Sequence, residues 1–100
     1  MPPNVPSGWT ESGNALTRTM ERTDFIEALA LVLEIGQRAE AANHHPDIDI
    51  RYRRVHLSLS THSAGNTVTE KDLALAQQIN DLGDDSIRRT ADELRRRFAG

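Results

Sequence analysis

A change of hydrophobic period at Pro46 constrains the fold of this chain more than any other feature. Before it, apolar side chains recur at helical spacing between Phe25 and Ala39. Proline cannot continue a helix, and it disfavours helical backbone at the residue before it, so we expect the helix to end near Asn43. After it, apolar and polar residues alternate, which is typical of strand. The chain should therefore hold a long helix that leads directly into a sheet.

Capping patterns indicate where helices begin. Asp24 followed by Glu27, and Thr69 followed by Asp72, have the spacing of a capping box, in which the first side chain binds exposed amides. Residues 84–98 predict an additional C-terminal helix with one apolar face and one face crowded with arginine. Its apolar stripe needs a hydrophobic partner, either within the fold or in another subunit.

Two regions predict strands. Short strands flank the turn-forming cluster Ser12-Gly13-Asn14, which indicates a hairpin. Two alternating sets lie between Ile48 and Leu59 but differ in phase, so we expect a bulge or a twist near Arg53-Arg54. Together the elements predict an α+β fold: an antiparallel sheet of about four strands, with helices packed on one face and an extra C-terminal helix.

The composition narrows the organisation and the function classes. A length of 100 residues allows one domain, which we place at residues 8–100 after a flexible tail at residues 1–7. The net charge of -3 shows no basic excess for nucleic acid, and no apolar run is long enough to span a membrane. Because cysteine and a signal-peptide pattern are both missing from the sequence, we expect a cytoplasmic protein.

Three of the four histidines gather near acidic residues in two short segments. Glu40 lies four residues before His44, so helical geometry would place both side chains on one face. His62 is expected at the end of a strand, and Asp72 in the first turn of the next helix. Such ends can meet at one rim of a sheet, where imidazoles can give and take protons near neutral pH.

The spacing of this cluster resembles the pterin-4a-carbinolamine dehydratase family. The family pattern E-x-x-x-H-H-P is matched from Glu40 to Pro46, and the match extends over roughly residues 8 to 82. The positions that carry the resemblance are Glu40, His44, His45, Pro46, Tyr52, His62 and Asp72. The resemblance implies a hydro-lyase, acting without a cofactor, that dehydrates 4a-hydroxytetrahydropterin to quinonoid dihydropterin in tetrahydrobiopterin recycling. It also implies a homodimer or homotetramer.

The resemblance assigns the catalytic roles. His44 and His62 are the expected acid/base pair. His45 would bind and orient the pterin and take part in proton transfer. Asp72 would orient an imidazole and favour its charged form, although its capping position alone would also explain a carboxylate there. Which histidine gives a proton first stays open.

Two further residues are expected in substrate binding. Glu40 would polarise His44 or hydrogen-bond the substrate, and Tyr52 would contact the pterin ring. Both have simpler explanations: Glu40 as a solvated charge that pairs with Arg38, and Tyr52 as a core residue that continues the face of Ile50.

The same residues allow two other interpretations, a metal site and a non-catalytic module. A metal site could be built from Glu40, His44 and His62, but adjacent histidines point in different directions and no HExxH frame is present, so we expect no metal. The alternative to the enzyme is a non-catalytic binding or dimerisation module of the same fold that acts in transcriptional regulation. Retention of the histidines favours the enzyme, because a scaffold has no physical need for them.

Overall fold

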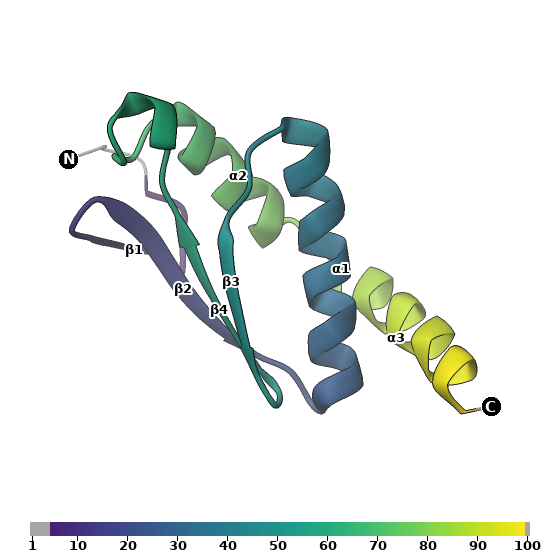
Figure 1. The fold of residues 1–100 in the computed structure, drawn as a ribbon. Coiled ribbons are helices and arrows are strands. Elements are labelled where there is room, and N and C mark those ends of the chain that lie inside the picture. The colour runs from purple at the N-terminus through teal and green to yellow at the C-terminus, as the bar shows by residue number, and fades with distance from the viewer. Residues whose placement is uncertain (1–4, 100) are drawn as a thin grey trace.

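A four-stranded antiparallel sheet carries helices on one of its faces (Figure 1). The computed structural model describes residues 5–99. The strands lie in the order β1-β2-β4-β3. Their bounds are Thr10–Ser12 for β1, Ala15–Glu21 for β2, Asp47–Arg51 for β3 and Arg54–Leu59 for β4. The predicted α+β class is confirmed.

In the described part of the chain, three α-helices and one short 3-10 helix complete the fold. They are α1 (Phe25–Ala42), η1 (His62–Ala64), α2 (Glu70–Asn80) and α3 (Asp84–Phe98). The helices α1 and α2 cover the sheet, whereas α3 packs on α1 and lies farther from the sheet (Figure 1). Asp24 accepts a hydrogen bond from the amide of Glu27 at 2.9 Å, as its capping position predicts.

The alternation of apolar residues shifts between Ile48 and Leu59 because the chain reverses direction there. The prediction of a bulge or twist is therefore wrong. Strands β3 and β4 form a hairpin in which Arg51 pairs with Arg54, leaving Tyr52 and Arg53 in the turn. Tyr52 takes the left-handed conformation there, with φ of 56°. Pairing brings the two apolar sets onto the same face of the sheet, although their positions differ in parity.

The core lies between this face and the helices. It is built mainly from aliphatic side chains, in agreement with the scarcity of aromatic residues. The largest fully buried apolar side chains are Leu16, Leu31, Ile35, Val55, Leu57, Leu59, Leu75, Ile79 and Ile87. The opposite face of the sheet carries polar side chains, with His56 hydrogen-bonded to Thr19 at 2.8 Å.

The segment before β1 is held against the fold. Trp9 is buried, and its indole nitrogen donates a hydrogen bond to Oδ1 of Asn80 at 2.9 Å. The side-chain amide of Asn80 also donates to the Ser7 carbonyl at 2.8 Å, and Val5 packs against the core. The loose tail predicted for residues 1–7 therefore does not extend to Val5–Ser7, while residues 1–4 lie outside the described part of the chain.

Helix α3 is joined to α1 by apolar and polar contacts. Ile87 and Ala91 are buried within the core cluster. Beside them, the buried carboxylate of Glu34 on α1 accepts hydrogen bonds from Ser86 at 2.6 Å and Thr90 at 3.2 Å. The part of the expected apolar stripe at Ile87 and Ala91 therefore has a partner within the chain, whereas Phe98 at the end of the helix is exposed.

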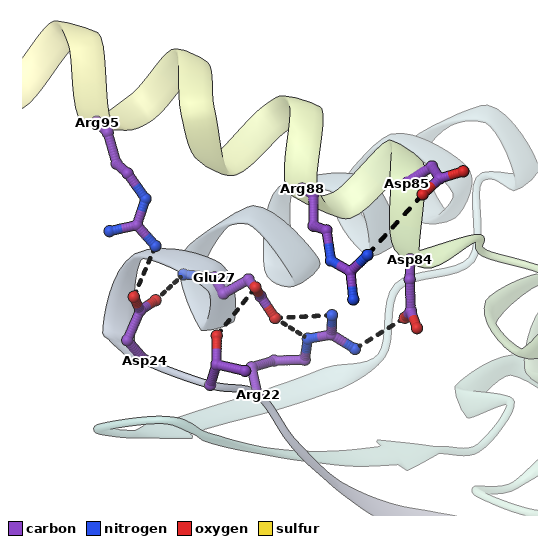
Figure 2. A network of polar contacts seen from close by, with 8 residues as sticks. Arg22, Asp24, Glu27, Asp84, Asp85, Arg88 and Arg95 are labelled. Carbon is purple, nitrogen blue, oxygen red and sulfur yellow. Dashed lines mark hydrogen bonds and ion pairs between the residues drawn. The ribbon is translucent and has the colours of Figure 1, made fainter.

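A charged network ties both ends of α3 to the start of α1 (Figure 2). Arg22 forms ion pairs with Glu27 at 2.7 Å and with Asp84 at 3.2 Å, and Arg95 pairs with Asp24 at 2.6 Å. Arg22 thus bridges the first turns of α1 and α3.

Two carboxyl groups of this network titrate below their ordinary range. The backbone amide of Glu27 and then the Arg95 guanidinium lower the pKa of Asp24 by hydrogen bonding to its charged form. Burial acts to raise the pKa of Glu27, but hydrogen bonds from Thr23 and Arg22 outweigh it, so that pKa is lowered as well. The network therefore favours the ionised state of both side chains.

Candidate active site

A cleft lies at one end of the sheet, where the end of α1, the end of β4 and the start of α2 come together. Its volume is about 520 Å³, which suits a small organic molecule because ligand pockets usually measure ~300–1,000 Å³. The lining residues are Asn43, His44, His45, Pro46, Asp47, Thr61, His62, Ser63 and Lys71. The cleft therefore contains the three histidines that the sequence singles out.

The backbone at Asn43 places the two adjacent histidines. Asn43 has left-handed φ and ψ of 50° and 44°, and its amide binds the carbonyl of Glu40 at 3.1 Å. The amide of His44 binds the carbonyl of Ala39 at 3.0 Å. This is the Schellman arrangement that ends a helix, and Pro46 prevents any continuation. The backbone therefore turns away from the helix axis directly before His44 and His45, and both residues line the cleft.

His44 is held by a buried carboxylate. Its Nε2 lies 2.5 Å from Oδ1 of Asp72, whose side chain has no exposed surface. The second oxygen of Asp72 accepts hydrogen bonds from the Thr61 hydroxyl and from the Thr69 amide, each at 2.8 Å. Asp72 is thus both a helix cap and the partner of an imidazole, so the two explanations of this residue are compatible.

His45 has a different partner. Its Nε2 lies 2.8 Å from Oε1 of Glu40, and both side chains are exposed. The interpretation of Glu40 as the partner of His44 is therefore wrong in this structure. The i, i+4 rule assumes that both residues are helical, but the helix has ended before His44.

His62 approaches the cleft from a separate segment. It begins η1, directly after the buried residue Thr61, and its side chain is exposed. Within residues 5–99, its ring makes no hydrogen bond to the protein. The imidazole is therefore accessible to a bound molecule.

Tyr52 is not part of this cleft, and its predicted role in contacting the pterin needs correction. It lies in the β3–β4 turn and is 68% exposed, so it is not a core residue either. The cleft includes Pro46 and Asp47, which stand at the other end of β3. A strand of five residues spans about 16 Å at ~3.3 Å per residue, so Tyr52 cannot reach the cleft of its own chain.

The structure adds residues that sequence reasoning did not single out. Lys71 and Asp47 bring opposite charges to the cleft, and Ser63 brings a hydroxyl group. Thr61 contributes a buried hydroxyl that contacts Asp72. Adjacency was the only available signal: Lys71 precedes Asp72, and Thr61 and Ser63 flank His62.

Within residues 5–99, no group of three or more histidine or acidic residues is arranged to hold a metal ion. In the same part of the chain, no helix is both long enough and apolar enough to cross a membrane.

Comparison with known proteins identifies the class to which this fold and cleft belong. The family model for pterin 4 alpha carbinolamine dehydratase matches residues 3–82, and the chain belongs to this family. A relative from Thermomicrobium roseum is 52% identical over 75 residues, which cover 75% of this chain and 80% of the relative. A relative from Roseiflexus sp. is 50% identical over 76 residues, which cover 76% and 81%. Both are provisionally named pterin-4-alpha-carbinolamine dehydratases.

Solved structures agree with this family. A Brucella melitensis protein described as a transcriptional coactivator/pterin dehydratase has 37% sequence identity and a TM-score of 0.69, covering 74% of this chain and 80% of that one. A pterin dehydratase-like protein identified as a RuBisCO assembly factor in the alpha-carboxysome has a TM-score of 0.61 over 72% and 84% of the two chains. Its 19% identity supports the fold alone. Helix α3 lies beyond the residues that the family model matches.

Proposed function

We propose that this protein is a hydro-lyase that dehydrates 4a-hydroxytetrahydropterin to quinonoid dihydropterin in tetrahydrobiopterin recycling. The observation that carries the proposal is the pair of imidazoles in one cleft, with His44 held by the buried Asp72 and His62 left accessible. Family membership supports the same chemistry.

The reaction needs two proton transfers. One imidazole gives a proton to the hydroxyl group on the saturated ring carbon, and the C–O bond breaks with its electron pair leaving as water. The other imidazole takes the proton from a ring nitrogen, and the freed electron pair forms the new carbon–nitrogen double bond. The atoms balance as one substrate giving one product and one water. Imidazole suits both steps because it can act as an acid or a base near neutral pH.

The remaining residues of the cleft would place the substrate. His45 would orient the pterin ring, and Glu40 fixes the His45 ring through its hydrogen bond at 2.8 Å. Lys71 and Asp47 would supply an additional donor and acceptor. No cofactor or metal takes part in the proposed reaction.

The proposal is tested by adding the protein to chemically generated 4a-hydroxytetrahydropterin. We expect dehydration well above the rate in buffer, with His44→Gln and His62→Gln each lowering kcat by roughly 100- to 10,000-fold, the usual contribution of a general acid or base. His56→Gln is the matched control, because this histidine lies on the opposite face of the sheet and contacts Thr19. A wild-type rate equal to that of buffer would refute the proposal.

A second candidate function is a dimerisation module in transcriptional regulation. The description of the Brucella melitensis relative as a coactivator as well as a pterin dehydratase favours it. The same assay separates the two functions, because a pure binding module would leave the dehydration rate at that of buffer. We also propose that the protein is cytoplasmic and forms a homodimer or homotetramer. Sedimentation of the purified protein would measure the number of subunits.

A further inference from the structure

A chain of hydrogen bonds ends on the carboxylate that holds His44. The amide of Lys71 donates to Oγ1 of Thr69 at 3.3 Å, and this hydroxyl lies 2.7 Å from Oγ1 of Thr61. The Thr61 hydroxyl lies 2.8 Å from Oδ2 of Asp72. Both Thr61 and Asp72 are buried, so water does not compete for the contact between them, whereas the Lys71 contact at the outer end of the chain is exposed.

The chemistry of the groups gives this chain one direction. A hydroxyl has a single proton to donate, and a carboxylate only accepts hydrogen bonds. Thr61 must therefore donate to Asp72, so Thr69 must donate to Thr61. The amide of Lys71 then satisfies Thr69, and every proton in the chain points toward Asp72.

The acceptor chemistry of Asp72 also decides which nitrogen of His44 carries a proton. Oδ2 of Asp72 already accepts from the Thr61 hydroxyl and the Thr69 amide, so Oδ1 is the oxygen left for His44. At 2.5 Å from this oxygen, Nε2 of His44 must be the donor. Nδ1 is then the ring nitrogen free for proton transfer, and among residues 5–99 no hydrogen bond to it is formed.

We propose that Thr61 is a positioning residue whose hydroxyl locks the Asp72 carboxylate, so that His44 presents Nδ1 to the substrate. Thr61 is itself fixed, because its amide binds the Thr67 carbonyl at 2.9 Å and its side chain is only 5% exposed. The inference rests on the proposed function in that it assigns His44 a proton-transfer role, but the hydrogen-bond lock exists without substrate.

The test compares Thr61→Val, which removes the hydroxyl at similar volume, with Thr61→Ser, which keeps it. In the wild-type protein, proton NMR should show a downfield ring N–H resonance of His44, assigned by its absence in His44→Gln. Thr61→Val should speed exchange of this proton with water by roughly tenfold or more. This factor corresponds to the free energy that a hydrogen bond to a charged group contributes. Thr61→Ser should restore the wild-type exchange rate.

Kinetics provide a second readout. Thr61→Val should lower kcat by a similar factor and change KM little, since the hydroxyl acts through Asp72 and His44 rather than on the substrate. Thr17→Val is the matched control, because its hydroxyl contacts the Thr10 carbonyl at 3.4 Å, away from the cleft. It should change neither the resonance nor kcat.

The outcomes separate this inference from the proposed function. A wild-type His44 resonance and exchange rate in Thr61→Val would overturn the inference, as would failure of Thr61→Ser to restore them. Thr61→Ala serves the same comparison if the valine variant does not fold. Failure of the wild-type protein to dehydrate the pterin would count against the proposed function, while the resonance would still decide whether Thr61 locks His44.

Discussion

Single residues with unusual backbone angles set the geometry of the cleft. Asn43 adopts φ of 50° at the end of α1, a conformation that favours glycine or asparagine and penalises a β-branched side chain. We predict that Asn43→Val lowers the free energy of unfolding by roughly 1–2 kcal/mol, the cost of a left-handed residue. Chemical denaturation measures this change.

Asn43→Gly is the control for that prediction, since glycine adopts the same angles without strain. It should retain the stability of the wild-type protein. Equal stability of the valine and glycine variants would contradict the role given to the left-handed backbone.

At this scale, the sequence predicted that His44, His45 and His62 lie close together but not all of their partners. The capping position of Asp72 is a local pattern, and the helix start confirms it. Its contact with His44 joins residues far apart in the chain, so no local spacing could reveal it. Helical spacing predicts that Glu40 and His44 share a face. This prediction fails because Asn43 turns the chain out of the helix, and Glu40 pairs with His45.

Among the elements, α3 allows a direct test of how much its packing stabilises the fold, because it carries both buried and exposed apolar side chains. Ile87 is 1% exposed in the core cluster, whereas Phe98 of the same helix is 65% exposed. We predict that Ile87→Ala lowers the free energy of unfolding by about 2–5 kcal/mol, as for other buried aliphatic side chains. Phe98→Ala should change it by no more than ~0.5 kcal/mol. Thermal or chemical unfolding of both variants decides the point, and a small effect of Ile87→Ala would show that α3 contributes little.

The charged network between α1 and α3 should make stability fall in acid. In the folded protein, the pKa values of Asp24 and Glu27 lie below the ordinary 3.8 and 4.5. The unfolded chain therefore binds more protons in acid, and this stabilisation is fully present above the ordinary values and lost as the pH falls through the lowered ones. We predict a melting temperature that declines over this window.

A matched pair of variants tests the origin of this decline. Glu27→Gln should flatten it, because the amide has no proton to gain from the solution in this window. Glu93→Gln should leave the slope unchanged, since Glu93 is exposed on α3 and its ion pair with Arg97 is long, at 3.6 Å. Equal slopes in the wild-type protein and the Glu27 variant would contradict the prediction.

Elements were predicted best where the signals were local. The additional helix over residues 84–98 matches α3, because its apolar stripe and charged face repeat at helical spacing. The hairpin between β3 and β4 was missed as a turn because Tyr52 and Arg53 are not typical turn residues. Only the pairing of Arg51 with Arg54 distinguishes a reversal from a bulge.

For the molecule as a whole, the cleft and the β3–β4 turn lie at opposite ends of the sheet. We therefore predict that Tyr52→Ala changes kcat/KM for the pterin less than about twofold, because the altered side chain is about 16 Å from the cleft along β3. Steady-state kinetics measure this ratio. A large loss of kcat/KM would mean that Tyr52 of a second subunit enters the cleft.

The hydrogen bonds of Asp72 have a consequence for how the protein acquires its cleft during folding. The bond to His44 spans 28 residues and the bond from Thr61 spans 11, so these two bonds join the segments that follow α1 and β4 to the start of α2. The intervening chain must close into a loop before either of these two bonds can form, and closure costs chain entropy. Helices and hairpins form from nearby residues and can precede that step. A partly folded molecule can therefore be rich in secondary structure and still lack the oriented His44, so the cleft belongs only to the fully assembled fold.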